Sequence, residues 1–126
     1  MEIIATDAAP AAIGPYSQAI QADGWLFCSG QIALRPGGGG DLVAGGVEAE
    51  ARQVFAILKA VLEAGGSGFD KVVKTTVYLT TMDDFPAVNR LYEEAFGAHK
   101  PARATVAVAQ LPKNAKVEVD AVARVR

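Results

Sequence analysis

The stretch VVKTTVYLTTMDDFPAVNRLYEEAF, residues 72–96, combines a strand with a helix and decides the fold. Residues 72–79 are rich in β-branched side chains, which favours a strand. Asp83 or Asp84 is a suitable helix cap, and Pro86 is tolerated in a first helical turn. A glycine ends the predicted helix, whose apolar face comprises Phe85, Val88, Leu91, Tyr92, Ala95 and Phe96.

Upstream of this stretch, the sequence predicts a hairpin and a second helix. Residues 17–22 and 25–29 are short strand candidates, and the Asp23-Gly24 pair between them is a strong signal for a two-residue hairpin turn. A glycine-rich segment at residues 36–40 then indicates a flexible loop. The helix that follows it ends at Gly65-Gly66, and its apolar residues recur at helical spacing: Val47, Ala51, Val54, Phe55, Leu58, Val61 and Leu62.

Two more strands are expected at residues 104–109 and 116–125. The predicted order is therefore ββ-α-β-α-ββ, with room for a short extra strand before the hairpin. This order indicates an α+β fold in which two helices pack on one face of a mixed sheet. A chain of 126 residues is the right size for a single domain, residues 1–126.

Alternation along the last two strands assigns side chains to the two faces of the sheet. Val117, Val119, Ala121, Ala123 and Val125 should meet the helices, as should Ala104, Val106 and Val108. Arg103, Thr105 and Glu118 are then expected together on the face that the helices leave uncovered. Charges alone favour a solvated face. The apolar neighbours Ala107 and Val122 instead favour cover by adjacent subunits, with a pocket at the seam.

The composition excludes several classes of protein. The net charge is −2, with no basic stripe for a nucleic-acid backbone. Hydrophobic residues make up 51% and mean hydropathy is +0.21, but no apolar run reaches the ~20 residues of a membrane span. Cys28 is the one cysteine, which excludes an internal disulfide and fits a reducing compartment. Because no signal-peptide core follows Met1, the sequence predicts a cytoplasmic protein.

Four segments together resemble the RidA (YjgF) family of enamine/imine deaminases. They are GPYSQA at residues 14–19, CSGQI at 28–32, KTTVYLTTMDDFPAVNRLYEEAF at 74–96, and PARATVAVAQLPKNAKVEVDAVA at 101–123. The resemblance covers nearly the whole chain in the right order, the glycine-rich loop excepted. It implies a chorismate-mutase-like fold assembled as a homotrimer, with sites in clefts between subunits.

The resemblance also implies an activity and its residues. Family members hydrolyse 2-aminoacrylate-type enamines and their imine tautomers, such as 2-iminopropanoate and 2-iminobutanoate, to 2-oxo acids and ammonia without a cofactor. Carried over by position, Arg103 should hold the substrate carboxylate and Glu118 should activate the attacking water. Tyr16, Gly30, Asn89 and Thr105 match positions that line the cleft, and Thr105 stands where many members have cysteine.

Other interpretations stay open at this stage. A non-catalytic trimer that binds small carboxylate metabolites would also use Arg103, whereas pairing it with Glu118 favours catalysis. RNA cleavage is disfavoured by the acidic charge balance, and a chaperone role has no specific support. A metal site at His99, the only histidine, lacks evident ligand partners, and Cys28 is expected to be a packed side chain rather than a nucleophile.

Overall fold

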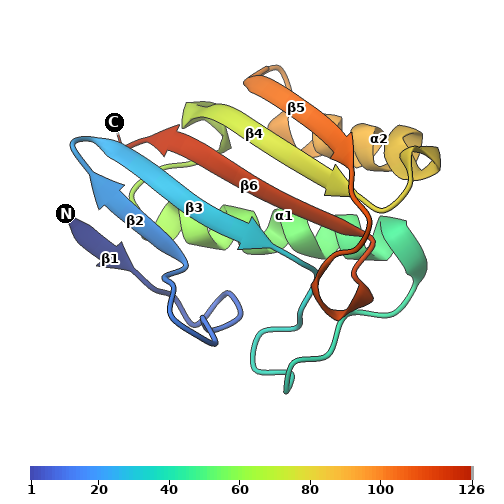
Figure 1. Cartoon of the computed structure of the whole chain (residues 1–126). Helices are drawn as coiled ribbons and strands as arrows, with labels where there is room; N and C mark the ends of the chain where they lie inside the picture. Colours follow the sequence, from blue (N-terminus) through green and yellow to red (C-terminus); the bar gives the residue numbers. More distant parts are fainter. Residues whose placement is uncertain (126) are drawn as a thin grey trace.

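The computed structural model describes residues 1–125, which form a six-stranded sheet with two helices on one face (Figure 1). The strands are β1 (Glu2–Ile4), β2 (Ala19–Ala22), β3 (Trp25–Gln31), β4 (Val72–Leu79), β5 (Ala102–Ala107) and β6 (Val117–Arg124). The helices are α1 (Gly46–Ala64) and α2 (Phe85–Phe96), and the short 3₁₀ turns are η1 (Phe69–Lys71), η2 (Met82–Asp84) and η3 (Pro112–Asn114). The predicted order is confirmed, and β1 is the extra strand.

The strands lie in the order β1-β2-β3-β6-β4-β5. Neighbours are antiparallel except β4 and β5, which are parallel because α2 carries the chain across between them. The predicted mixed sheet is therefore confirmed. The Asp23-Gly24 turn also forms as expected, with both residues in the left-handed region at φ 53° and 81°.

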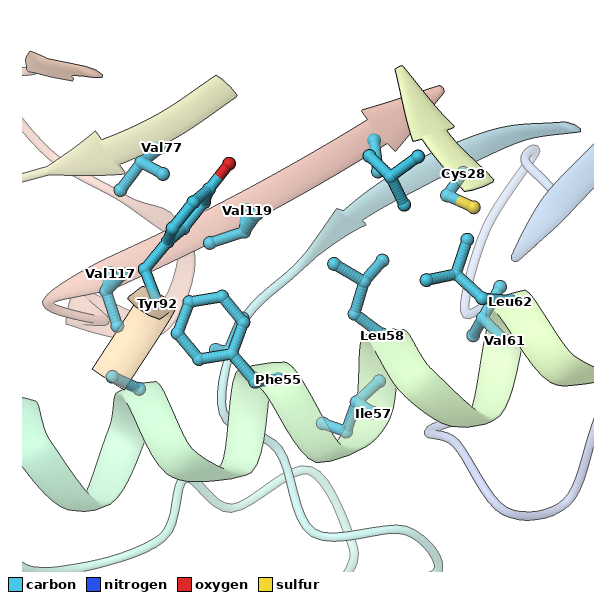
Figure 2. Packing of buried hydrophobic residues seen from close by; sticks show 14 of the residues in the cluster. Cys28, Phe55, Ile57, Leu58, Val61, Leu62, Val77, Tyr92, Val117 and Val119 are labelled. Atoms are coloured by element: carbon cyan, nitrogen blue, oxygen red, sulfur yellow. The ribbon is translucent and has the colours of Figure 1, made fainter. Parts of the chain in front are cut away.

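The core lies between the sheet and α1, as Figure 2 shows. Leu58, Val61 and Leu62 of α1 are completely buried, as are Val117 and Val119 of β6. Burying a side chain of this size stabilises the fold by roughly 1.5–3 kcal/mol. The helical spacing of apolar residues therefore predicts the buried face of α1 correctly.

The start of α2 differs from the expected cap. Asp84 stands at the N-cap position, but its side chain makes no capping hydrogen bond. The turn η2 is capped one step earlier, where the Asp83 amide donates to Thr81 Oγ1 at 3.1 Å. The Thr81 hydroxyl therefore stabilises the entry into α2, since η2 leads directly into that helix.

The predicted faces of β5 are wrong. Parallel pairing aligns Arg103 with Thr75, and Thr105 with Val77. Thr75 and Val77 are buried beneath the helices, so Arg103 and Thr105 lie on the helix side of the sheet. Val106, expected in the core, is 41% exposed. Alternation identified the two sets of side chains but not which set faces inward, because the short side chains of this edge strand give little contrast.

The other face of the sheet, called here the open face, is partly apolar. Alternation in β6 is confirmed, since Val117 to Ala123 alternate between buried and half-buried. Across four strands, one in-register row on the open face consists of Ile3, Ile20, Phe27 and Val122. Ile3 is 69% exposed and Phe27 is 49% exposed.

Within residues 1–125, neither helix has the length and apolarity needed to span a membrane.

Candidate functional site

A hollow of about 420 Å³ lies between α2, the segment after it and β5. Asn89 and Tyr92 of α2 contribute to its lining, as do His99, Lys100 and Arg103. Asn89 and Tyr92 are three residues apart, so they share one face of the helix. This spacing, together with the return of the chain into β5, places polar and aromatic groups around Arg103.

Arg103 is held on several sides by neutral groups. Its Nη1 donates to Asn89 Oδ1 at 2.7 Å. The guanidinium carbon lies 4.7 Å from the centroid of the Tyr92 ring and 5.5 Å from that of Phe85. Among residues 1–125, no carboxylate lies within ion-pair distance of Arg103. The positioned guanidinium therefore keeps donors available for a planar anion such as a carboxylate.

Tyr92 forms the support beneath this cation. Its hydroxyl lies 2.8 Å from Thr75 Oγ1 in a buried hydrogen bond, and its ring stacks on Phe96 at 4.5 Å between centroids. Burial raises the pKa of Tyr92, opposed by the Thr75 hydrogen bond and the Arg103 charge. Tyr92 is therefore a neutral phenol at physiological pH. Figure 2 shows its ring beside Phe55 and Val77. The sequence identified Tyr92 as a core residue but missed this contact with Arg103.

Thr105 lies two residues along β5 from Arg103, on the same side of the sheet. Its hydroxyl is buried and has no hydrogen-bond partner among residues 1–125. A buried hydroxyl without a partner costs about 1–3 kcal/mol. The Thr105 hydroxyl therefore lacks the bond that would offset its burial.

A second hollow of about 480 Å³ lies beside the N-terminal segment, at the ends of β3 and β6. Its lining includes the polar side chains of Tyr16, Lys113 and Glu118, together with Gly30. Its apolar walls are Pro10, Ala11, Ile13, Ile32 and Leu34. Carboxylate, ammonium and phenol groups are therefore grouped in a largely apolar concavity.

Gly30 makes room for the Glu118 carboxylate. A Cβ at Gly30 would lie 2.9 Å from the carboxyl carbon of Glu118 and still closer to its Oε2. The register between β3 and β6 shifts between Cys28 and Gln31, which brings the Gly30 backbone alongside the glutamate. Any larger residue at position 30 would displace this carboxylate, so the glycine shapes the second hollow.

Burial and the neighbouring Asp120 favour the protonated form of Glu118. Burial raises the pKa of Glu118, and the charge of Asp120 raises it further. Asp120 in turn accepts a hydrogen bond from the Tyr78 hydroxyl at 3.1 Å. A carboxylate with a raised pKa is a better base towards water than an ordinary one.

Gln18 is a positioning residue that sequence reasoning missed. It is buried, its Oε1 accepts from the Thr6 amide at 2.7 Å, and its Nε2 donates to the carbonyls of Pro10 at 2.8 Å and Thr6 at 3.2 Å. These bonds hold the segment that carries Tyr16 against the sheet. The position of Gln18 inside the GPYSQA motif was the available signal.

The predicted site residues fall into two groups. Arg103, Asn89 and Thr105 lie together on the helix side, whereas Tyr16, Gly30 and Glu118 line the second hollow. The expectation that Arg103 and Glu118 share a face is wrong, because Glu118 is on the open face. The raised pKa of Glu118 also has burial and Asp120 as its causes, without the expected influence of Arg103.

Two other reactive side chains, Cys28 and His99, are held by packing or by contact with the backbone. Cys28 is buried, and burial followed by the Asp120 charge raises its pKa to about 12, so the packed interpretation is confirmed. His99 Nε2 lies 2.6 Å from the Val72 carbonyl oxygen. In the described part of the chain, residues 1–125, no group of three or more His, Cys, Asp or Glu is placed to hold a metal ion.

Comparison with protein families matches residues 6–125 to the family described as Endoribonuclease L-PSP. Among curated proteins, the 2-iminobutanoate/2-iminopropanoate deaminase of Mus musculus is 49% identical over 122 residues, which are 97% of this chain and 90% of that protein. Other relatives are named only as RutC family proteins.

Solved structures agree with this match. RidA from the Antarctic bacterium Psychrobacter sp. PAMC 21119 superposes with a TM-score of 0.93 at 40% identity, covering 98% of this chain and 99% of that one. E. coli TdcF with bound serine superposes with a TM-score of 0.92 at 38% identity, covering 98% of both chains. The sheet and helices described above are therefore those of the Rid fold.

Proposed function

Since the chain belongs to the Endoribonuclease L-PSP (YjgF/RidA) family, we propose that it is a hydrolytic deaminase of reactive enamines and imines. Its substrates would be 2-aminoacrylate/2-iminopropanoate and 2-iminobutanoate, and its products 2-oxo acids and ammonia. The observation that carries the proposal is the Arg103 guanidinium, held by Asn89 and Tyr92 without a carboxylate partner among residues 1–125. The mouse and human relatives named 2-iminobutanoate/2-iminopropanoate deaminase, which are 49% and 47% identical to this chain, support the same activity.

The residue roles follow from the chemistry of an imino acid. Arg103 binds the permanent carboxylate of the substrate through paired donors, with Asn89 and Thr105 beside it. Water adds to the imine carbon and gives its proton to Glu118, so that a C–O bond forms and the C=N bond becomes single. Glu118 returns this proton to the nitrogen. Glu118 then takes up the hydroxyl proton as the C=O bond forms and delivers it to the amino group as the C–N bond breaks, so that ammonia leaves and the carboxylate is ionised again.

The separation of the two hollows supports a site shared between subunits. Arg103 and Glu118 lie on opposite sides of the sheet in one chain. One substrate can meet both only if one chain supplies Arg103 and a neighbouring copy supplies Glu118, Tyr16 and Gly30. The exposed apolar row on the open face gives a reason for copies to associate. We therefore propose a homotrimer with inter-subunit sites.

A second candidate is a non-catalytic trimer that binds small carboxylate metabolites. The relative TdcF with bound serine favours it, because serine carries the carboxylate that such a site would hold. Assaying ammonia release from freshly generated 2-iminopropanoate separates the two. The deaminase should accelerate release above the spontaneous rate and lose this acceleration in Glu118→Gln. A binder would leave the spontaneous rate unchanged while still retaining the ligand.

The proposal also covers the cofactor requirement, the domain organisation and the cellular compartment. The chemistry above needs no cofactor, and one domain over residues 1–126 would suffice for it. The single buried Cys28 fits a cytoplasmic protein. We do not propose RNA cleavage despite the family's description, because 14 acidic residues outnumber 12 basic ones in this chain.

A further inference from the structure

The strand β6 carries two carboxylates side by side on the open face. Glu118 and Asp120 are two residues apart, so both side chains project from the same face of the strand. Asp120 is paired across the sheet with Thr76, and Glu118 with Tyr78. Two like charges this close disfavour the simultaneous ionisation of both groups.

Tyr78 distinguishes the two carboxylates, because it bonds to only one of them. Its hydroxyl donates to Asp120 Oδ2 at 3.1 Å, which fixes the orientation of that carboxylate. Glu118 accepts no such bond within residues 1–125 and is half-buried against Gly30. The environment therefore separates the pair into a carboxylate held by a hydrogen bond and a carboxylate whose pKa is raised by burial and by its neighbour.

The ionisable groups that face Glu118 come from four elements. β3 contributes none, because Gly30 stands at that position. The others are Asp120 on β6, Lys116 just before β6, Tyr78 on β4, Lys113 on η3, and Tyr16 on the N-terminal segment. Of these groups, only Asp120 is a carboxylate, so it is the one that adds to the effect of burial in favouring a proton on Glu118.

We propose that Asp120, held by the Tyr78 hydroxyl, is a positioning residue that makes Glu118 a stronger base towards the attacking water. The inference rests on the proposed deaminase function. In the transition state a proton moves from water to Glu118, and the nearby negative charge stabilises Glu118 as it becomes neutral. Asp120 touches neither the water nor the substrate in this step.

The test is the pH profile of kcat/KM for ammonia release by the full-length wild type and by Asp120→Asn. Removing the charge lowers the pKa of Glu118, so the acidic limb of the profile moves to lower pH. The plateau should fall about three- to tenfold, because the base is weaker. Asp120→Glu keeps the charge and should restore the position of the limb. Asp70→Asn, an exposed aspartate in η1, removes the same charge elsewhere and should leave the profile unchanged.

Tyr78→Phe provides a second variant that keeps both carboxylates. Without the hydroxyl, Asp120 loses its orientation, so kcat should fall while KM stays near the wild-type value. An acidic limb that does not move in folded Asp120→Asn overturns the inference. If Asp120→Asn does not fold, an unchanged kcat in Tyr78→Phe overturns it instead. Absence of ammonia release by the wild type would overturn the proposed function and, with it, this inference.

Discussion

Replacing Arg103 with alanine removes the cation on which the proposed site depends. Two charge-assisted hydrogen bonds to a substrate carboxylate contribute about 1.5–3 kcal/mol each, or roughly 3–6 kcal/mol together. At about 1.4 kcal/mol for each tenfold change, kcat/KM should fall about 10²- to 10⁴-fold. Because the carboxylate is bound both before and during reaction, most of this loss should appear as a higher KM.

The same change has a smaller effect on stability. Arg103→Ala loses the 2.7 Å bond to Asn89 and the contacts with the rings of Tyr92 and Phe85. Since the side chain is largely exposed, these amount to roughly 1–3 kcal/mol in the free energy of unfolding. Thermal unfolding should therefore still show one cooperative transition, at a Tm several degrees lower.

The assay couples ammonia release from freshly generated 2-iminopropanoate to a spectrophotometric readout, with light scattering on each sample to follow the oligomer. Arg52→Ala is the matched control, because Arg52 is an exposed arginine on α1 whose ion pair with Glu94 spans 3.7 Å. It should retain full activity. Arg103→Lys should recover only part of the loss, since an ammonium lacks the planar paired donors. Near-normal ammonia release by folded Arg103→Ala would refute the assignment of Arg103 to the substrate carboxylate.

Three further changes test other contacts. Gly30→Ala should lower kcat at least tenfold, because the new Cβ displaces the Glu118 carboxylate, while circular dichroism stays native; wild-type kcat would argue against a role for this carboxylate. Tyr92→Phe leaves Thr75 Oγ1 buried without its partner, so chemical denaturation should show a loss of about 1–3 kcal/mol; an unchanged midpoint would contradict this. Gln18→Ala frees the segment at residues 6–10, whose amide hydrogens should exchange faster in the variant than in the wild type, while exchange in α1 stays unchanged. Equal protection of the segment in both proteins would show that Gln18 does not hold it.

Local sequence patterns were sufficient for most of the secondary structure. The apolar residues of α1 recur every three or four positions, and all of those predicted are buried except Val47, which is half-buried. The hairpin turn follows from Asp23-Gly24, because this pair readily takes the left-handed conformation that a tight turn requires. Residues 72–79 form β4 with the predicted bounds. In each case the signal lies within a few residues, so no knowledge of distant contacts is needed.

The orientation of Arg103 depends on pairing between strands that are far apart in the sequence. Within PARATVAV every residue of both alternating sets except Arg103 is small or apolar, so alternation gives little contrast between the two faces. Parallel alignment with β4 decides the question by placing Arg103 beside the buried Thr75. The crossover through α2 sets that alignment, and it separates Arg103 from Glu118 across the sheet. The residue types of the candidate site could thus be predicted locally, whereas its division into two halves arises from long-range strand register, which local alternation does not encode.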